Sequence, residues 1–109
     1  MNTRKKRKDR NHIIYKITCL KTKERYIGLT LQVGQKKIGS ANIRLKSHIS
    51  RAKNGGGWKL HERIREIGPQ YFTTEVVDIV RGKTEAHLKE VYYIGKFMPE
   101  LNVRRKYGN

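Results

Sequence analysis

Residues 12–31 read HIIYKITCLKTKERYIGLTL, and this stretch decides the fold. Residues 12–18 alternate imperfectly between apolar and polar side chains and are rich in β-branched residues, which predicts a strand. Residues 20–24 are polar and turn-like, and residues 25–31 predict a second strand. Because so few residues separate the two strands, we expect them to pair as an antiparallel hairpin.

The hairpin carries two tyrosines, Tyr15 and Tyr26. Their hydroxyls emerge on one face of the sheet if the turn places residue 15 opposite residue 26 or 28. A register shifted by one residue would put them on opposite faces. Gly28 follows Tyr26 by two residues and so shares its face, and a strand glycine often marks the close approach of a ligand or another chain. A strand tyrosine taken alone more often packs the sheet than catalyses a reaction.

Beyond the hairpin, the chain predicts two helices, a strand and a final helix. The first helix, capped by Ser40 or Asn42, is predicted to end at the three glycines 55–57. Its expected core stripe is Leu45, Ile49 and Ala52. The following helix, strand and helix are predicted over residues 58–67, 71–80 and 84–98. The resulting order, β-β-α-α-β-α, indicates a single α+β domain.

The composition is dominated by positive charge. The chain has 109 residues, and its 26 lysines and arginines against 9 acidic residues give a formal net charge of +17. We divide it into a basic flexible arm over residues 1–11, a folded domain over 12–103 and a basic C-terminal tail over 104–109. A folded body this basic repels itself unless it binds a polyanion, of which nucleic acid is the commonest; an anionic membrane surface is the alternative.

Several features favour a cytoplasmic DNA-binding protein over a membrane protein. No apolar stretch approaches the ~18 residues that would span a bilayer. The single cysteine, Cys19, cannot form an internal disulfide, which indicates a reducing compartment. The arm can be a DNA clamp, a localisation signal or a solubilising tail, and the basic body favours the clamp. Its candidate DNA contacts are Arg4, Lys5, Lys6 and Arg7.

The last predicted helix places a carboxylate within an apolar and aromatic face. That face is formed by Ala86, Glu90, Tyr93, Ile94 and Phe97. Burying an unpaired carboxylate is costly, so Glu90 needs a cation: an arginine, a lysine or a metal ion. From this helix alone, a structural ion pair is favoured over a functional site.

The first predicted helix carries a complementary polar row. Arg44, Ser47, His48 and Arg51 lie at i, i+3, i+4 and i+7 and so share one face. Such a row can hold a phosphate, because arginine offers a planar fork of donors, serine a hydroxyl, and histidine a proton or hydrogen bond. The alternative is a solvated face on a basic protein. In the second predicted helix we expect Trp58 to pack near the start and His61 to be exposed, as is His87 in the last helix.

Taken together, these elements resemble the GIY-YIG nuclease family. Two tripeptides separated by ten residues, Ile13-Ile14-Tyr15 and Tyr26-Ile27-Gly28, are similar to those in the family name, although Ile13 stands where the family has glycine. The later family elements are resembled, in the right order, by Arg44-x-x-x-His48, Glu90-x-x-Tyr93-Ile94 and Leu101-Asn102. The resemblance covers residues 12–103 and is closest to the small nuclease domains of phage homing endonucleases.

The resemblance implies a fold and a metal. The family fold is a small three-stranded antiparallel sheet flanked by helices. Members use one divalent ion, so we expect Mg2+, with Mn2+ as the alternative, held by Glu90. One carboxylate suits Mg2+, which keeps several waters and needs only one or two carboxylates besides phosphate oxygens.

The resemblance also implies roles for the remaining residues. By analogy, Tyr15 is the general base or its relay, and Tyr26 orients the water or the scissile phosphate. Arg44 holds the phosphate, and His48 orients the water or accepts the proton of Tyr15. Asn102 braces the site by hydrogen bonds. The expected substrate-binding residues are Gly28, Ser47 and Arg51, together with the four basic residues of the arm.

The sequence thus favours a divalent-metal-dependent DNA endonuclease that works in a prokaryotic or phage-infected cell. We expect a monomer or weak dimer, with a protein partner or dimer supplying any target selection. The alternative is a non-catalytic basic module that binds RNA or DNA, and the composition fits it equally well. Glu90 separates the two, because a pure phosphate binder gains nothing from a carboxylate among its arginines.

Overall fold

The computed structural model describes residues 10–102 as an α+β fold with one antiparallel sheet. The arm residues Arg4, Lys5, Lys6 and Arg7 and the tail 104–109 lie outside the described residues. The strands and α-helices are β1 (Asn11–Cys19), β2 (Arg25–Leu31), α1 (Ile38–Lys53), α2 (Lys59–Ile67), β3 (Phe72–Arg81) and α3 (Lys83–Phe97). Short 3-10 helices, η2 (Pro69–Tyr71) and η3 (Glu100–Asn102), precede β3 and follow α3. The predicted element order is confirmed, and Asn11, assigned to the arm, already belongs to β1.

The three strands lie in the order β2-β1-β3, so β1 is central and β2 forms an edge. Both pairings are antiparallel, and Tyr15 lies opposite Gly28 while Ile17 lies opposite Tyr26. Because side chains alternate between faces, this register puts Tyr15 and Tyr26 on one face. Residue 15 opposite residue 28 is one of the two pairings that were expected to have this effect. On the other side of β1 the register shifts between Ile14 and Tyr15, which marks a β-bulge beside Tyr15.

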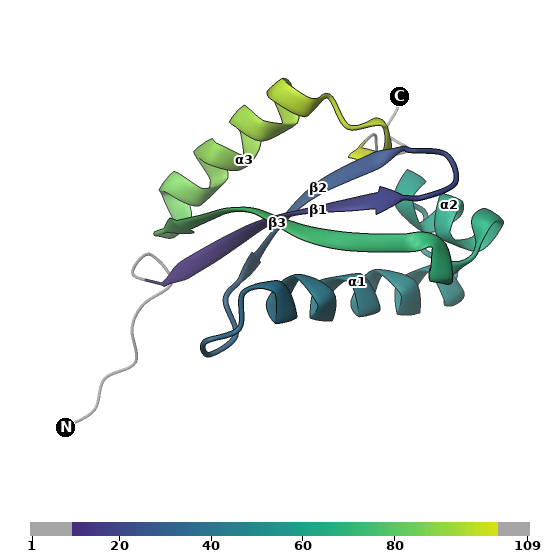
Figure 1. Ribbon diagram of the computed structural model, residues 1–109, viewed down its shortest axis with the longest axis horizontal. Helices are drawn as coiled ribbons and strands as arrows, with labels where there is room; N and C mark the ends of the chain where they lie inside the picture. The colour runs from purple at the N-terminus through teal and green to yellow at the C-terminus, as the bar shows by residue number, and fades with distance from the viewer. Residues whose placement is uncertain (1–9, 103–109) are drawn as a thin grey trace.

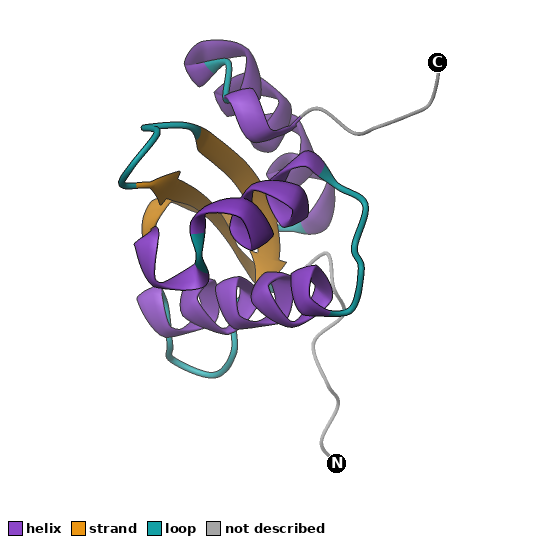
Figure 2. Ribbon diagram, turned by 90° about the vertical axis from the view of Figure 1, so that its right-hand side faces the viewer, coloured by secondary structure: helices purple, strands orange, loops and turns teal. Residues whose placement is uncertain are grey.

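Helices cover both faces of the sheet. α3 lies on one side, and α1 and α2 lie on the other (Figure 1); the view turned by 90° again places the strands between α3 and α1 (Figure 2). On the α3 side, the Tyr93 hydroxyl donates to Asp78 Oδ2 of β3 at 2.8 Å, and the Lys16 ammonium lies 5.0 Å from the centre of the Phe97 ring. These contacts tie α3 to β3 and to the central strand β1. No described helix is both long and apolar enough to cross a membrane.

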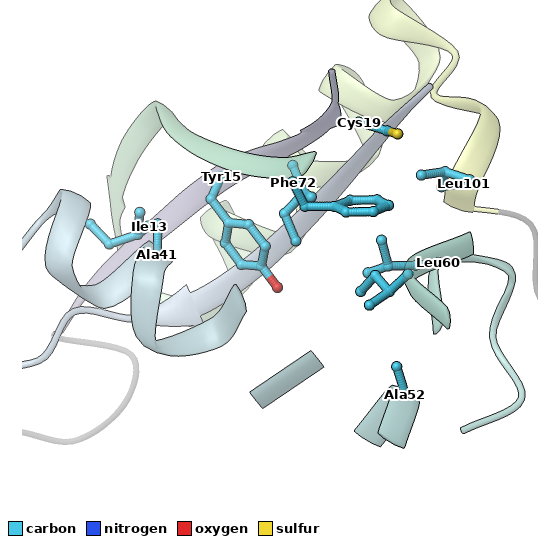
Figure 3. Close-up of a cluster of buried hydrophobic side chains, with 10 residues drawn as sticks. Ile13, Tyr15, Cys19, Ala41, Ala52, Leu60, Phe72 and Leu101 are labelled. Atoms are coloured by element: carbon cyan, nitrogen blue, oxygen red, sulfur yellow. The ribbon is translucent and has the colours of Figure 1, made fainter. Parts of the chain in front are cut away.

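The core lies between the sheet and the α1–α2 layer. Alternate β1 residues point into it, and helices and the chain end supply the rest; its buried members are Ile13, Tyr15, Ile17, Cys19, Ala41, Ala52, Leu60, Ile64, Phe72 and Leu101. Tyr15 is one of the largest of these side chains, and its ring extends from β1 toward the helices (Figure 3). Cys19 is a free, fully buried thiol of this core. The core therefore holds a candidate catalytic side chain in a fixed position.

α1 differs from its prediction in two respects. It begins at Ile38, so neither Ser40 nor Asn42 is its cap. The Ser40 hydroxyl instead donates to the Lys36 carbonyl at 2.6 Å and accepts from the Val33 amide at 2.8 Å, which ties the preceding loop to the helix. The predicted stripe residues pack against the core. His48, expected on the polar row, is instead fully buried; it lies on the same side of the helix as the buried Ala41, two turns before it, and Ala52, one turn after it.

Candidate active site

A cavity of about 430 Å³ runs along the edge strand β2, where the helices of both sheet faces meet. Its walls are formed by His12, Tyr15, Tyr26, Leu29, Thr30, Leu31, Arg44, Trp58, Lys83, His87 and Glu90. Four of the predicted site residues are among them: Tyr15 from β1, Tyr26 from β2, Arg44 from α1 and Glu90 from α3. Residues 75 positions apart along the chain are thus brought to one surface, with both phenols, the guanidinium and the carboxylate facing a common space.

The two tyrosines are positioned by the hairpin and by Gly28. Their ring centres are 6.3 Å apart. A Cβ atom on Gly28 would lie 2.4 Å from both Cζ and the hydroxyl oxygen of Tyr15, and 2.8 Å from Cε2 of Tyr26. No side chain fits there, so glycine lets the Tyr15 ring lie across β2. Gly28 was expected to admit a substrate; its backbone is instead covered by a tyrosine, and it does not line the cavity.

Tyr15 contacts a chain of two buried histidines. Its hydroxyl oxygen lies 3.1 Å from Nε2 of His48, and Nδ1 of His48 lies 3.2 Å from Nε2 of His61. His61, predicted to lie at the surface, is only 2% exposed. Trp58 stacks on it, with ring centres 5.0 Å apart and the planes 6° from parallel. The prediction for His61 was wrong because α1 and α2 pack closely enough to enclose its ring.

Burial sets the protonation states of the three hydrogen-bonded side chains. It lowers the pKa of His48 from 6.5 to about 3, and the positive charges of Arg44, His61 and Arg51 act in the same direction. Burial also lowers the pKa of His61, assisted by Arg51 and Arg65. Burial raises the pKa of Tyr15 above 10.0, against the opposing effect of Arg44. At neutral pH, His48 is therefore uncharged and Tyr15 is a phenol.

Arg44 is the residue of the predicted polar row that reaches the cavity. Within residues 10–102, its buried Nε has no hydrogen-bond partner, and its partly exposed side chain lies on the cavity wall, where the guanidinium can donate to an anionic ligand. Ser47 does not line the cavity. Arg51 lines another hollow, of about 350 Å³, together with Trp58 and His61, and its positive charge lowers the pKa of His48. The residues of the predicted polar row therefore do not share one site, and Arg44 is the one that lines the cavity with the two tyrosines.

Glu90 supplies the carboxylate of the cavity. Its Oε1 lies 3.7 Å from Nδ1 of His87, and Lys83 lines the same wall. Among the described residues, no group of three or more His, Cys, Asp or Glu side chains could hold a metal ion. A single partly exposed carboxylate beside open space fits an ion such as Mg2+, which takes most of its ligands from water and phosphate. Burial is the main cause of the raised pKa of Tyr15, and the negative charge of Glu90 adds to it.

Asn102 lies outside the cavity and holds the strand that carries Tyr26. The amide of Ile27 donates to its Oδ1 at 2.8 Å, and its Nδ2 donates to the carbonyl of Ile27 at 2.9 Å. These are edge groups of β2, on the side where the described sheet has no further strand. η3 is therefore fastened to β2 immediately between Tyr26 and Gly28.

Besides three residues of β2, sequence reasoning missed four cavity residues with ionisable or aromatic side chains: His12, Lys83, His87 and, in this role, Trp58. His87 precedes Glu90 by three positions on α3, so its place beside that carboxylate could have been predicted from helical spacing. His12 precedes Tyr15 by three residues on β1, and nothing in the strand pattern distinguishes it. No family model, curated protein or solved structure matches the chain.

Proposed function

We propose that the protein is a divalent-metal-dependent DNA endonuclease of the GIY-YIG type, which hydrolyses phosphodiester bonds in the cavity along β2. The observation that carries the proposal is the convergence of Tyr15, Tyr26, Arg44 and Glu90 on one cavity from four separate elements. The sequence motifs single out these four residues together with His48 and Asn102, which lie outside the cavity wall. The net charge of +17 supports a polyanionic substrate.

Arg44 is the phosphate-binding residue of this proposal. Its place on the cavity wall and the planar N–H donors of its guanidinium suit a non-bridging phosphate oxygen. The charge that develops on the phosphoryl oxygens during hydrolysis would strengthen this contact, and such differential binding is what accelerates the reaction.

Glu90 would hold the divalent ion, Mg2+ or Mn2+, with water and phosphate oxygens completing the ligand set. When bound, the ion supplies charge stabilisation to the phosphate and the leaving oxygen. The basic wall residue Lys83 and the exposed His87 surround Glu90, so this side of the cavity remains suited to anionic oxygens.

Tyr15 is the general base of the proposal. Tyr15 first loses its phenol proton to solvent through the cavity. Water then attacks phosphorus and its proton passes to the Tyr15 phenolate oxygen, while the bond from phosphorus to the leaving oxygen breaks and that oxygen takes up a proton from solvent. The phenolate is required, and burial opposes it while Arg44 favours it. Tyr26, with its ring centre 6.3 Å from that of Tyr15, orients the water or phosphate, and Asn102 keeps β2 in place.

Nicking of supercoiled plasmid by the full chain, with Mg2+ and with EDTA, tests the proposal. Glu90→Gln should lower the nicking rate by on the order of 10²–10³-fold, as loss of a preorganised electrostatic group does. DNA affinity, measured by fluorescence anisotropy without metal, should be unchanged or slightly higher. Glu85→Gln is the matched control, because it removes the same charge from an exposed position of the same helix.

Metal-independent nicking, or equal nicking by the wild type and Glu90→Gln, would contradict the role of Glu90. Tight DNA or RNA binding without any nicking would favour the non-catalytic nucleic-acid-binding module instead. As a nuclease, the protein would act where DNA is accessible, in the cytoplasm of a prokaryotic or phage-infected cell.

A further inference from the structure

His61 completes a chain of three polar groups that begins at the proposed base. From Tyr15 the chain runs 3.1 Å to His48 and 3.2 Å onward to His61. His48 and His61 are 0% and 2% exposed, so water does not compensate for a wrong hydrogen-bonding pattern. Each neutral imidazole has one donor nitrogen and one acceptor nitrogen, so the direction of one hydrogen bond in the chain fixes the direction of the other.

The surroundings of His61, the last group in this series of hydrogen bonds, fix the direction of both hydrogen bonds. Nδ1 of His61 is buried and has no hydrogen-bond partner within residues 10–102. A Cβ atom built on Gly56 would lie 2.3 Å from this nitrogen, so a Cα hydrogen of Gly56 points at it. A C–H group makes a weak favourable contact with a lone pair, whereas an N–H hydrogen in the same place would meet the C–H hydrogen head-on. Nδ1 of His61 therefore carries the lone pair, and its Nε2 carries the proton.

The protonation of His61 determines which ring nitrogen of His48 carries the proton, and so how His48 bonds to Tyr15. The His61 Nε2–H donates to Nδ1 of His48, which must then be an acceptor. His48 is neutral, because burial and the charges of Arg44 and Arg51 disfavour its protonation. Its one proton is accordingly on Nε2, and this N–H donates to the hydroxyl oxygen of Tyr15.

We propose that His61 is a positioning residue, which holds His48 in the Nε2–H tautomer so that His48 donates to Tyr15 and cannot accept its proton. The catalytic part of this inference rests on the proposed nuclease function; the direction of the hydrogen bonds does not. In this arrangement the N–H of His48 and the guanidinium of Arg44 both face the Tyr15 oxygen and stabilise its phenolate. The phenol proton leaves through the cavity, and the proton of the attacking water takes its place on Tyr15.

Nitrogen-15 NMR of the histidine rings tests the tautomers directly on the full chain at neutral pH, without DNA or metal. Long-range proton–nitrogen correlations distinguish a protonated from an unprotonated ring nitrogen. We expect the proton of both His48 and His61 on Nε2. A proton on Nδ1 of His48 would overturn the proposal, and because this measurement uses the wild type, it needs no variant to fold.

Two nearly isosteric substitutions separate positioning from packing. The glutamine amide of the His61→Gln variant can still donate to His48, so the tautomer of His48 should persist and the nicking rate should stay within about threefold. An ionised carboxylate in His61→Glu offers only acceptors and should move a proton to Nδ1 of His48; the nicking rate is compared at a pH where the nitrogen signals show that His48 is neutral. Loss of the charge-assisted donation to Tyr15 should then lower kcat by on the order of 10–100-fold with little change in KM for plasmid.

Ile64→Val is the control for a purely structural effect, because it loosens the same buried face of α2 while keeping both histidine rings. It should leave both the His48 signals and kcat unchanged. Equal losses in His61→Gln and His61→Glu, without a change of tautomer, would mean that His61 only packs. Absence of nicking in the wild type would refute the proposed function, whereas the nitrogen signals would still decide the direction of the hydrogen bonds.

Discussion

Acidification should destabilise the fold through one buried histidine. The pKa of His48 is lowered from 6.5 to about 3, chiefly by burial. Between these values the unfolded chain binds a proton that the folded protein does not, so stability is fully present above pH 6.5 and falls as the pH drops toward 3. Between pH 7 and pH 5 the linkage amounts to about 2 kcal/mol for His48 alone. His61, whose pKa is also lowered by burial, adds to the loss.

Urea unfolding at pH 7 and pH 5, followed by circular dichroism, measures this change. With an m-value typical of small proteins, about 2 kcal/mol moves the midpoint by roughly 1–2 M. Glu24 and Glu100 do not contribute to the change between pH 7 and pH 5. Their carboxyl pKa values are lowered below 4.5, so both remain ionised in the folded protein over this range. His48→Gln should lose most of the pH dependence, whereas His87→Gln, at an exposed position, should retain it. An unchanged wild-type midpoint between the two pH values would refute the buried neutral state of His48.

Three further results are expected. Gly28→Ala should cost about 1–3 kcal/mol, because the new methyl overlaps the rings of Tyr15 and, less closely, Tyr26. The cost should fall in a Tyr15→Ala background, with the remainder due to Tyr26, and an undiminished cost in this double-mutant cycle would refute the contact with Tyr15. Asn102→Ala should lower the free energy of unfolding by about 1–2 kcal/mol and speed amide exchange at Ile27, where an unchanged exchange rate would disprove the bracing role. Deleting residues 1–9 should reduce the salt dependence of DNA affinity, by a slope of about 0.9 for each phosphate that the arm neutralises; an unaltered slope would show that the arm neutralises none.

The elements that could be predicted from sequence are those whose local pattern agrees with their tertiary surroundings. The β1–β2 hairpin was evident because a short polar turn joins two β-branched runs, and its register follows once Tyr15 and Tyr26 face one core. On α3, Glu90 was singled out because a charge interrupts an apolar stripe, and the structure places it on the cavity wall. Such interruptions of periodicity carry information even in a single sequence.

Burial of the two histidines could not be read from the same patterns. His48 was assigned to a polar row because its neighbours in that row are charged, although it also shares a stripe with Ala41 and Ala52. Those small residues let α1 approach the sheet closely, and helix–sheet distance is a tertiary property. His61 lies three positions before Ile64 on the buried face of α2, a spacing that could have suggested burial. Its enclosure also needs Gly56, which leaves room for the ring.

The stacking of Trp58 on His61 gives the protein an intrinsic optical probe. Trp58 is the sole tryptophan of the chain, so all indole emission originates at the wall of this cavity. Its ring centre also lies 6.4 Å from that of Tyr26 and 5.8 Å from that of His48. An indole so placed responds to charge and hydration among these neighbours. Ligand entry, metal loading and histidine protonation can therefore be titrated by fluorescence on the unlabelled protein.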